Sequence, residues 1–132
     1  MFKFFTTLPE EKAKTISPVT LAFVGDAVYT LYVREKLVIS HDFSTGTMQK
    51  LSSSEVSAHG QNALLEKILP ALTEEETAVF KRGRNAKKPT RSKNATVAEY
   101  NNSTGFEALL GYLYLTGNYG RIEELLSKND EN

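Results

Sequence analysis

Hydrophobic and polar positions alternate with the period of α-helices along most of the chain. Ser17 followed by Pro18 is typical of a helix start, because proline at the first helical position loses no hydrogen bond. From Val19 to Val38, apolar residues cover most of the helical circumference, which predicts a largely buried helix. Its polar remainder is a narrow stripe of residues spaced four apart, namely Asp26, Thr30 and Arg34.

Shorter segments continue the helical pattern. The serine- and threonine-rich segment 41–60 favours one or two weaker helices, and a helix over 62–69 ends before Pro70. A short C-terminal helix is expected over 120–127. No strand alternation, repeat or linker interrupts the pattern. We therefore expect an all-α helical bundle that forms a single domain over residues 1–132.

Two capping boxes mark further helix starts. Thr73 is followed by Glu76, and Thr96 is followed by Glu99, at the spacing that lets side chain and backbone exchange hydrogen bonds. The first box opens a helix that ends near residue 81. The second precedes a helix that carries the apolar run 106–115 and stops at Gly117.

The basic segment, residues 81–93, carries seven basic residues and no acidic one. The rest of the chain has nine basic against sixteen acidic residues, so the net charge of zero conceals a local polycation. Gly83, Asn85, Pro89 and Asn94 predict that this segment is a loop. It can release counterions from phosphates and contact A-form RNA without reading bases, or it can simply be a solvated loop. The residues expected to bind RNA are Lys81, Arg82, Arg84, Asn85, Lys87, Lys88, Arg91 and Lys93.

Composition excludes several other classes of site. Hydrophobic residues make up 40% and charged residues 24% of the chain, as in ordinary soluble proteins. There is no apolar run near the roughly 20 residues that span a bilayer, and no secretory signal, so a cytoplasmic location is expected. Without cysteine there is no disulfide or thiolate site, and His41 and His59 alone leave little room for zinc. Any metal would be held mainly by oxygen.

Two carboxylates stand among apolar neighbours. Asp26 follows LAFVG, and Glu107 lies between GF and ALLGYLYL. A dehydrated carboxylate needs compensation, and a divalent cation such as Mg²⁺ would provide it. Gly25 and Gly111 interrupt the same helices and indicate either close helix packing or a functional need. The alternative is that Asp26 belongs to a solvated helix face and that Glu107 pairs with a lysine.

These segments resemble a known family. LAFVGDAV (residues 21–28) resembles the signature of ribonuclease III, and FEALLGYLYLTG (residues 106–117) is similar to that family's second catalytic helix. The basic segment adds RGRNAK, PT and KN. With no double-stranded-RNA-binding domain attached, the chain is similar to the branch that consists of the catalytic domain only, Mini-ribonuclease III.

The resemblance implies a helical, homodimeric endoribonuclease with one active centre per subunit. Each centre would hydrolyse one strand of double-stranded RNA with Mg²⁺, for which Mn²⁺ can substitute, and leave 5′-phosphate and 3′-hydroxyl ends. Asp26 and Glu107 carry over as the catalytic metal ligands. The implied substrate is precursor large-subunit (23S) ribosomal RNA, cut where its ends pair, with a large-subunit ribosomal protein assisting.

The chain departs from the full-length family pattern at several acidic positions. Val19 and Ala22 stand where acidic residues are expected, and Thr104 replaces an aspartate. Asn101 stands where relatives tend to have arginine, which would weaken a phosphate contact. The two remaining carboxylates predict at least one Mg²⁺ ion. The alternative is a catalytically silent module of the same fold that binds structured RNA in a ribosomal particle.

Overall fold

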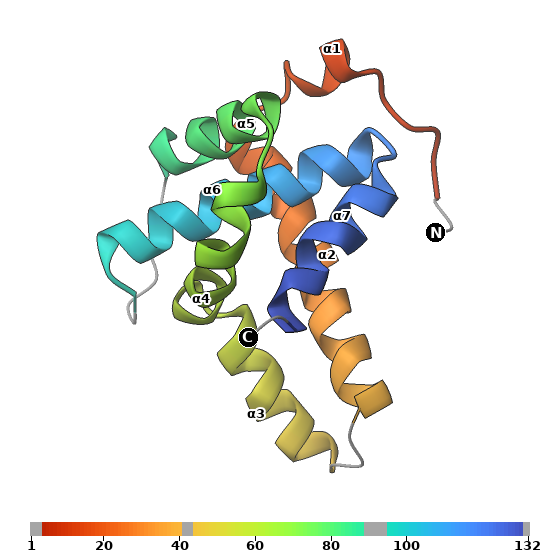
Figure 1. Cartoon of the computed structure of the whole chain (residues 1–132), viewed down its shortest axis with the longest axis vertical. Coiled ribbons are helices and arrows are strands. Elements are labelled where there is room, and N and C mark those ends of the chain that lie inside the picture. Colours follow the sequence, from red (N-terminus) through yellow and green to blue (C-terminus); the bar gives the residue numbers. More distant parts are fainter. Residues whose placement is uncertain (1–3, 41–43, 89–94, 131–132) are drawn as a thin grey trace.

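The computed structural model describes residues 4–40, 44–88 and 95–130, most of which lie in helices (Figure 1). Within these ranges there is no strand, which confirms the all-α class. The α-helices are α1 (Glu10–Ala13), α2 (Pro18–Ser40), α3 (Thr45–Val56), α4 (Ala58–Ile68), α5 (Glu74–Asn85), α6 (Val97–Leu115) and α7 (Tyr119–Leu126). Short 3₁₀ helices follow α4 (Leu69–Ala71) and α7 (Ser127–Asp130).

The local signals for helix ends are confirmed. α2 starts at Pro18, and both capping boxes form: each threonine side chain accepts a backbone N–H, and each glutamate returns a bond to the cap. Beyond the end of α6, Gly117 adopts a φ of 80°, a conformation that favours glycine. The backbone N–H of Asn118 then donates to the carbonyl of Leu113, which closes the helix end.

Two predictions about local structure are wrong. The first part of the basic segment is helical, because α5 continues to Asn85, and only the residues after it leave the helix. The continuation has a packing reason, since Gly83 lies against α6 and is buried. The second error concerns α2. Its apolar residues are not all enclosed in the core, since Phe23 is 81% exposed and Leu31 is 63% exposed.

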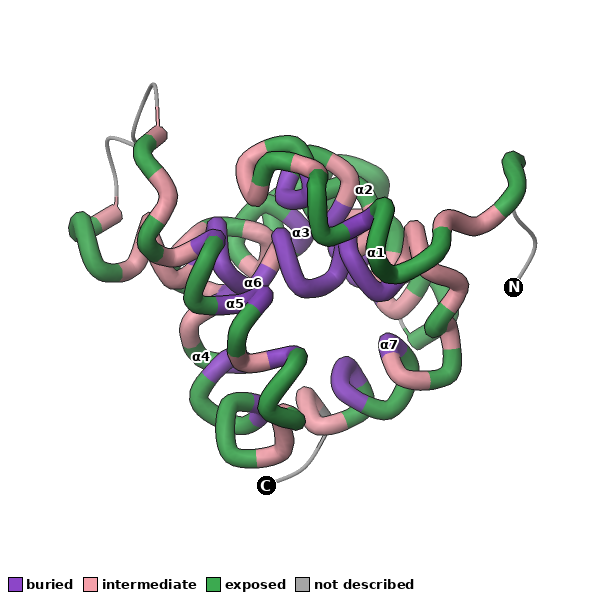
Figure 2. Tube along the Cα trace, turned by 90° about the horizontal axis from the view of Figure 1, so that it is seen from above, coloured by how far each residue is buried: buried purple, intermediate pink, exposed green. Residues whose placement is uncertain are grey.

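α6 is the central element. In Figure 1 it crosses the molecule, and it packs against α2, α5, α4 and α7. Ten of its residues from Ser103 to Leu113 are buried, as expected for a helix that is apolar almost all round. Figure 2 shows the buried residues on the inward sides of the surrounding helices. α6 is therefore the element against which the other helices are positioned.

Glycine pairs set how closely the helices approach α6. A Cβ atom on Gly25 of α2 would overlap the carbonyl oxygen of Glu107, and one on Gly111 would overlap the carbonyl oxygen of Leu21. On another side of α6, a Cβ on Gly83 would lie 2.8 Å from the Cα of Gly105. The expectation of close packing at Gly25 and Gly111 is confirmed. At these crossings backbone packs directly on backbone.

Replacing Gly25 with alanine should therefore force α2 and α6 apart. We expect the free energy of unfolding of Gly25→Ala to fall by about 1–3 kcal/mol or more in urea titrations, because an added methyl group overfills a packed contact. Gly120→Ala is the control, since a Cβ there meets nothing within 4 Å. It should keep or raise stability, by up to about 1 kcal/mol. Equal stability of the two variants would contradict the role of the crossing.

Candidate active site

The crossing of α2 and α6 brings Asp26 next to Glu107. Asp26 follows Gly25, whose backbone contacts that of Glu107, and the two carboxylates interact directly. The two environments differ, because Asp26 is exposed whereas Glu107 is largely enclosed. The expected loss of hydration thus holds for Glu107 and is wrong for Asp26. One carboxylate of the pair faces solvent and the other lies behind it.

Burial raises the pKa of Glu107 from its ordinary value of 4.5 to about 8. A hydrogen bond from Gln61 acts in the opposite direction, and the charge and side-chain contact of Asp26 raise the pKa further. No ion pair between described residues includes Glu107, so the alternative pairing with a lysine is not found in that part of the chain. Glu107 is a half-buried carboxylate beside a second carboxylate, with the Gln61 amide as its polar partner.

Gln61 of α4 is the site residue that sequence reasoning missed. Its Nε2 donates to Oε2 of Glu107 at 3.0 Å and to the carbonyl oxygen of Val56 at 2.9 Å. A signal was present in the sequence. Gln61 occupies the first position of a stripe at i, i+3, i+4 and i+7 whose other members are apolar: Leu64, Leu65 and Ile68. A polar residue on such a stripe indicates a specific partner in the interior.

The donor set fits a hard divalent cation. Two carboxylates held in contact repel each other, and a cation between them removes this conflict. Mg²⁺ commonly uses one or two carboxylates and completes its shell with waters and substrate phosphates. Among the described residues there is no group of three or more acidic, histidine or cysteine side chains that could hold a metal. Asp26 and Glu107 are the two carboxylates that the helix crossing brings together, and they would hold such an ion.

The residues at the positions that depart from the family pattern supply no further carboxylate to the site. Ala22 is 6% exposed and lies in the core. Thr104 is also 6% exposed, and its hydroxyl donates to the carbonyl oxygen of Tyr100 within α6. Asn101 is half-buried on the same helix, and its expected weaker phosphate contact stays a prediction.

The basic segment is only partly described, because Arg91 and Lys93 lie outside the described residues. Several of its other cations have local partners: Arg82 donates to the carbonyl oxygen of Lys14, and Lys88 donates to that of Arg84 at the end of α5. Burial lowers the pKa of Lys88. Lys81, Asn85 and Lys87 are exposed.

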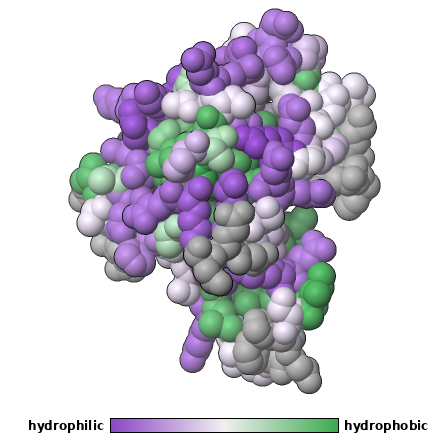
Figure 3. Space-filling model, viewed as in Figure 1, coloured by the Kyte–Doolittle hydropathy of each residue, from purple (hydrophilic) through white to green (hydrophobic). Residues whose placement is uncertain are grey.

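The described part of the basic segment does not meet the carboxylates. α5 contacts α6 at Gly105, two residues before Glu107. At 3.6 residues per turn, positions two apart point to nearly opposite sides of a helix. The end of α5 and the carboxylate pair therefore lie on different sides of α6. The upper left of Figure 3, where α5 lies in the same view, is strongly hydrophilic.

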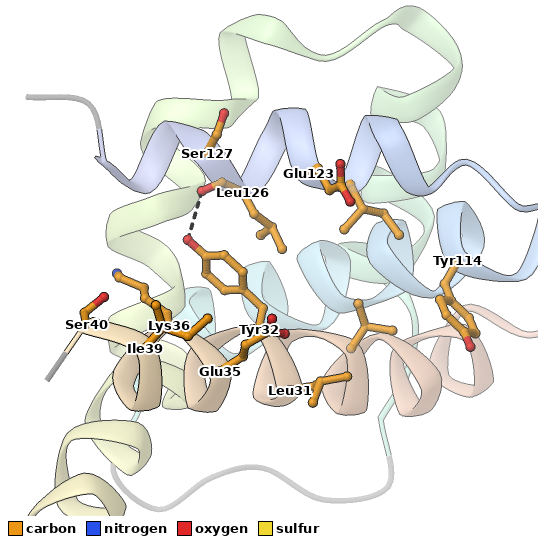
Figure 4. A pocket seen from close by; sticks show the side chains of 12 residues that line it. Leu31, Tyr32, Glu35, Lys36, Ile39, Ser40, Tyr114, Glu123, Leu126 and Ser127 are labelled. Carbon is orange, nitrogen blue, oxygen red and sulfur yellow. Dashed lines mark hydrogen bonds between the residues drawn. The ribbon is translucent and has the colours of Figure 1, made fainter. Parts of the chain in front are cut away.

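The exposed side of α2 forms an apolar face that leads into a groove. Phe23 is 81% and Leu31 63% exposed on this side, and Ile39, which is 76% exposed, lies farther round the helix toward the groove. The groove, of about 490 Å³, lies between α2 and α7, and Figure 4 shows its lining side chains. At its floor the Tyr32 hydroxyl donates to the carbonyl oxygen of Leu126 at 3.3 Å. Leu31 and Ile39 line this groove, so the apolar face is continuous with it.

Comparisons with known proteins agree with this arrangement. Residues 19–118 match the Ribonuclease III domain. Mini-ribonuclease 3 of Thermoanaerobacter sp. is 42% identical, covering 90% of this chain and 84% of that protein. Mini-ribonuclease 3 of Symbiobacterium thermophilum is 46% identical, covering 85% and 86%. A crystal structure of a Fusobacterium nucleatum protein superposes with a TM-score of 0.76 at 32% identity, covering 84% of this chain and 88% of that one.

The raised pKa of Glu107 predicts a pH-dependent loss of stability in metal-free protein. Because the folded value of about 8 exceeds the ordinary 4.5, its contribution is full below 4.5 and is lost as the pH rises through 8. Urea titrations in chelator should show the parent losing stability over this range relative to Glu107→Gln. Glu66→Gln, at an exposed position of α4, should keep the parental profile. Parallel profiles for parent and Glu107→Gln would refute the assignment.

Proposed function

Because the chain belongs to the ribonuclease III family and is an endoribonuclease, we propose that it cuts double-stranded RNA with a magnesium ion held by Asp26 and Glu107. The observation that carries the proposal is the contact between these two carboxylates without a cationic partner among the described residues. Mn²⁺ has the same preference for oxygen ligands and can replace Mg²⁺. Hydrolysis would leave 5′-phosphate and 3′-hydroxyl ends.

The two carboxylates have different tasks in this proposal. Glu107, which is enclosed and bonded to Gln61, provides a fixed ligand, whereas the exposed Asp26 faces the side from which a phosphate arrives. When bound, the ion would lower the pKa of a water ligand and stabilise the charge that develops on the phosphate. Glu107 must lose its proton to bind the ion. Binding of the ion therefore favours the ionised form of Glu107, and ionisation of Glu107 favours binding of the ion.

The concentration of basic residues in the segment 81–93 of an otherwise acidic chain favours RNA as the substrate. We propose that the exposed Lys81 and Lys87, together with Asn85, contact phosphates and 2′-hydroxyls along the duplex. Arg91 and Lys93 are proposed to extend this contact. Arg82, Arg84 and Lys88 have local partners in the protein and contribute mainly to the surrounding potential. The acidic remainder of the chain repels RNA, which orients the duplex toward the basic segment.

We further propose that the active form is a homodimer built on the apolar face of α2. A second copy is the occupant that fits, because two-fold symmetry buries the same apolar residues of both subunits together. Phe23, one turn from Asp26, belongs to this face. Pairing there would place both metal sites beside the interface, where each could cut one strand of the same duplex.

The natural substrate we propose is precursor 23S ribosomal RNA, cut in the duplex that its ends form, with assistance from a large-subunit ribosomal protein. This proposal is supported by the similarity to the Mini-ribonuclease 3 proteins. Such a substrate places the enzyme in the cytoplasm. In the described part of the chain, no helix is long and apolar enough to cross a membrane.

The first test is cleavage of a perfect RNA duplex in Mg²⁺. Asp26→Asn and Glu107→Gln should each lower the cleavage rate by about 10³-fold or more, because loss of the ion removes several kcal/mol of transition-state stabilisation. Duplex binding should persist in both variants, and Glu66→Gln should cut like the parent. If the parent binds the duplex without cutting it, the chain is the silent RNA-binding module instead.

The dimer is tested by charging its proposed face. Leu31→Glu should convert the protein to a monomer in sedimentation experiments and leave duplexes nicked rather than cut through, because burying an unpaired carboxylate costs several kcal/mol. Val97→Glu is the matched control, since Val97 is 53% exposed at the start of α6. It should sediment as the parent does. A monomeric parent, or a dimeric Leu31→Glu, would overturn the proposed interface.

A further inference from the structure

Gln61 is a buried amide on a helix face that packing alone would fill with an apolar side chain. It is 2% exposed, and the next members of its stripe on α4 are the buried leucines Leu64 and Leu65. Leucine or methionine at this position would extend the stripe and avoid dehydrating an amide. The presence of glutamine therefore calls for a role beyond filling the core.

Its hydrogen bonds show how the amide is used. One Nε2 hydrogen is directed to the carbonyl oxygen of Val56, the last residue of α3, which fixes the amide plane. The other is directed to Oε2 of Glu107 at 3.0 Å. Both donor hydrogens are thus committed, and the orientation of the amide is set from two sides.

The acceptor end of the same amide is unsatisfied. Gln61 Oε1 is buried and has no hydrogen-bond partner among the described residues. An unpaired buried acceptor costs free energy, and replacing the whole amide by an apolar group would remove that cost. The fold therefore carries Gln61 at a disadvantage, and the bond to Glu107 is the contact that accounts for keeping it.

We infer that Gln61 is a positioning residue of the metal site, which holds Oε2 of Glu107 so that the carboxylate presents its other oxygen to the ion. This inference rests on the proposed function of Glu107 as a metal ligand. A side chain with a hydrogen bond to one oxygen cannot rotate freely about its terminal bond, so fewer orientations are lost when the ion binds. With two carboxylates in the site, the orientation of each ligand matters more than in a larger acidic cluster.

Gln61 also connects α4 to a site whose carboxylates come from α2 and α6. α4 reaches Glu107 through Gln61, and the bond to Val56 anchors the same amide to the end of α3. Asn62, the next residue, provides a comparison within the same helix. Its Nδ2 donates to the carbonyl oxygens of Ala58 and Glu99, so it also joins α4 to α6, but no hydrogen bond between described residues joins it to Asp26 or Glu107.

The test measures Mn²⁺ binding by titration calorimetry and, separately, unfolding by urea in chelator. Gln61→Met keeps the length of the side chain and removes the amide. It should weaken Mn²⁺ binding by about 10- to 100-fold, as loss of an outer-shell partner typically does. In chelator the variant should stay folded with a urea midpoint near the parental one, because the two lost hydrogen bonds and the removed unpaired acceptor have opposite effects on stability. Raising the Mg²⁺ concentration should restore cleavage of the RNA duplex. Asn62→Leu, the matched control, should bind Mn²⁺ as the parent does.

Each outcome separates this inference from the proposed function. If Gln61→Met binds Mn²⁺ as tightly as the parent while Glu107→Gln does not bind it, Gln61 is structural and the inference is overturned. If Glu107→Gln also binds like the parent, the proposed function itself fails. If Gln61→Met does not fold, Gln61→Asn carries the same expectation, because it retains a buried amide that is one methylene too short to reach Glu107.

Discussion

The close crossing of α2 and α6 is the constraint on which the rest of the structure depends. Without side chains at Gly25 and Gly111, the two backbones come into direct contact, and this contact places Asp26 beside Glu107. A side chain at either glycine would separate the helices and with them the two carboxylates. The same backbone contact therefore determines how the two helices pack and where the two carboxylates lie. The buried centre of α6 holds this contact in place.

Electrostatics makes this arrangement unfavourable unless a cation is present. Burial raises the pKa of Glu107, and the neighbouring Asp26 raises it further, so the metal-free site favours a protonated glutamate. A divalent ion reverses this preference, since it stabilises the ionised form of both side chains. The two adjacent carboxylates therefore favour a positive ion between them. The hydrogen bond from Gln61 acts in the same direction as the ion, because it too favours ionised Glu107.

The helix boundaries could largely be predicted from local sequence. Capping boxes, proline and glycine signals fixed the helix starts and ends, because these depend on neighbouring residues. Long-range contacts could not be read in the same way. Pattern alone did not show that α5 continues through Gly83 into the basic segment, since only its packing on Gly105 explains the glycine. The apolar pattern of α2 predicts a largely buried helix, yet the single chain leaves Phe23 and Leu31 exposed. Gln61, the partner of Glu107, lies 46 residues away in the sequence, so no local pattern links the two.

The central claim is that Asp26 and Glu107 together hold a divalent ion. Its most direct test is anomalous X-ray diffraction from crystals of the parent protein and of Glu107→Gln grown with Mn²⁺. The parent should show an anomalous peak between the carboxylates of Asp26 and Glu107, with the Gln61 amide still bonded to Glu107, and the variant should show a weak peak or none. An ordered Mn²⁺ ion elsewhere with none at this pair, or equal peaks in the two proteins, would contradict it.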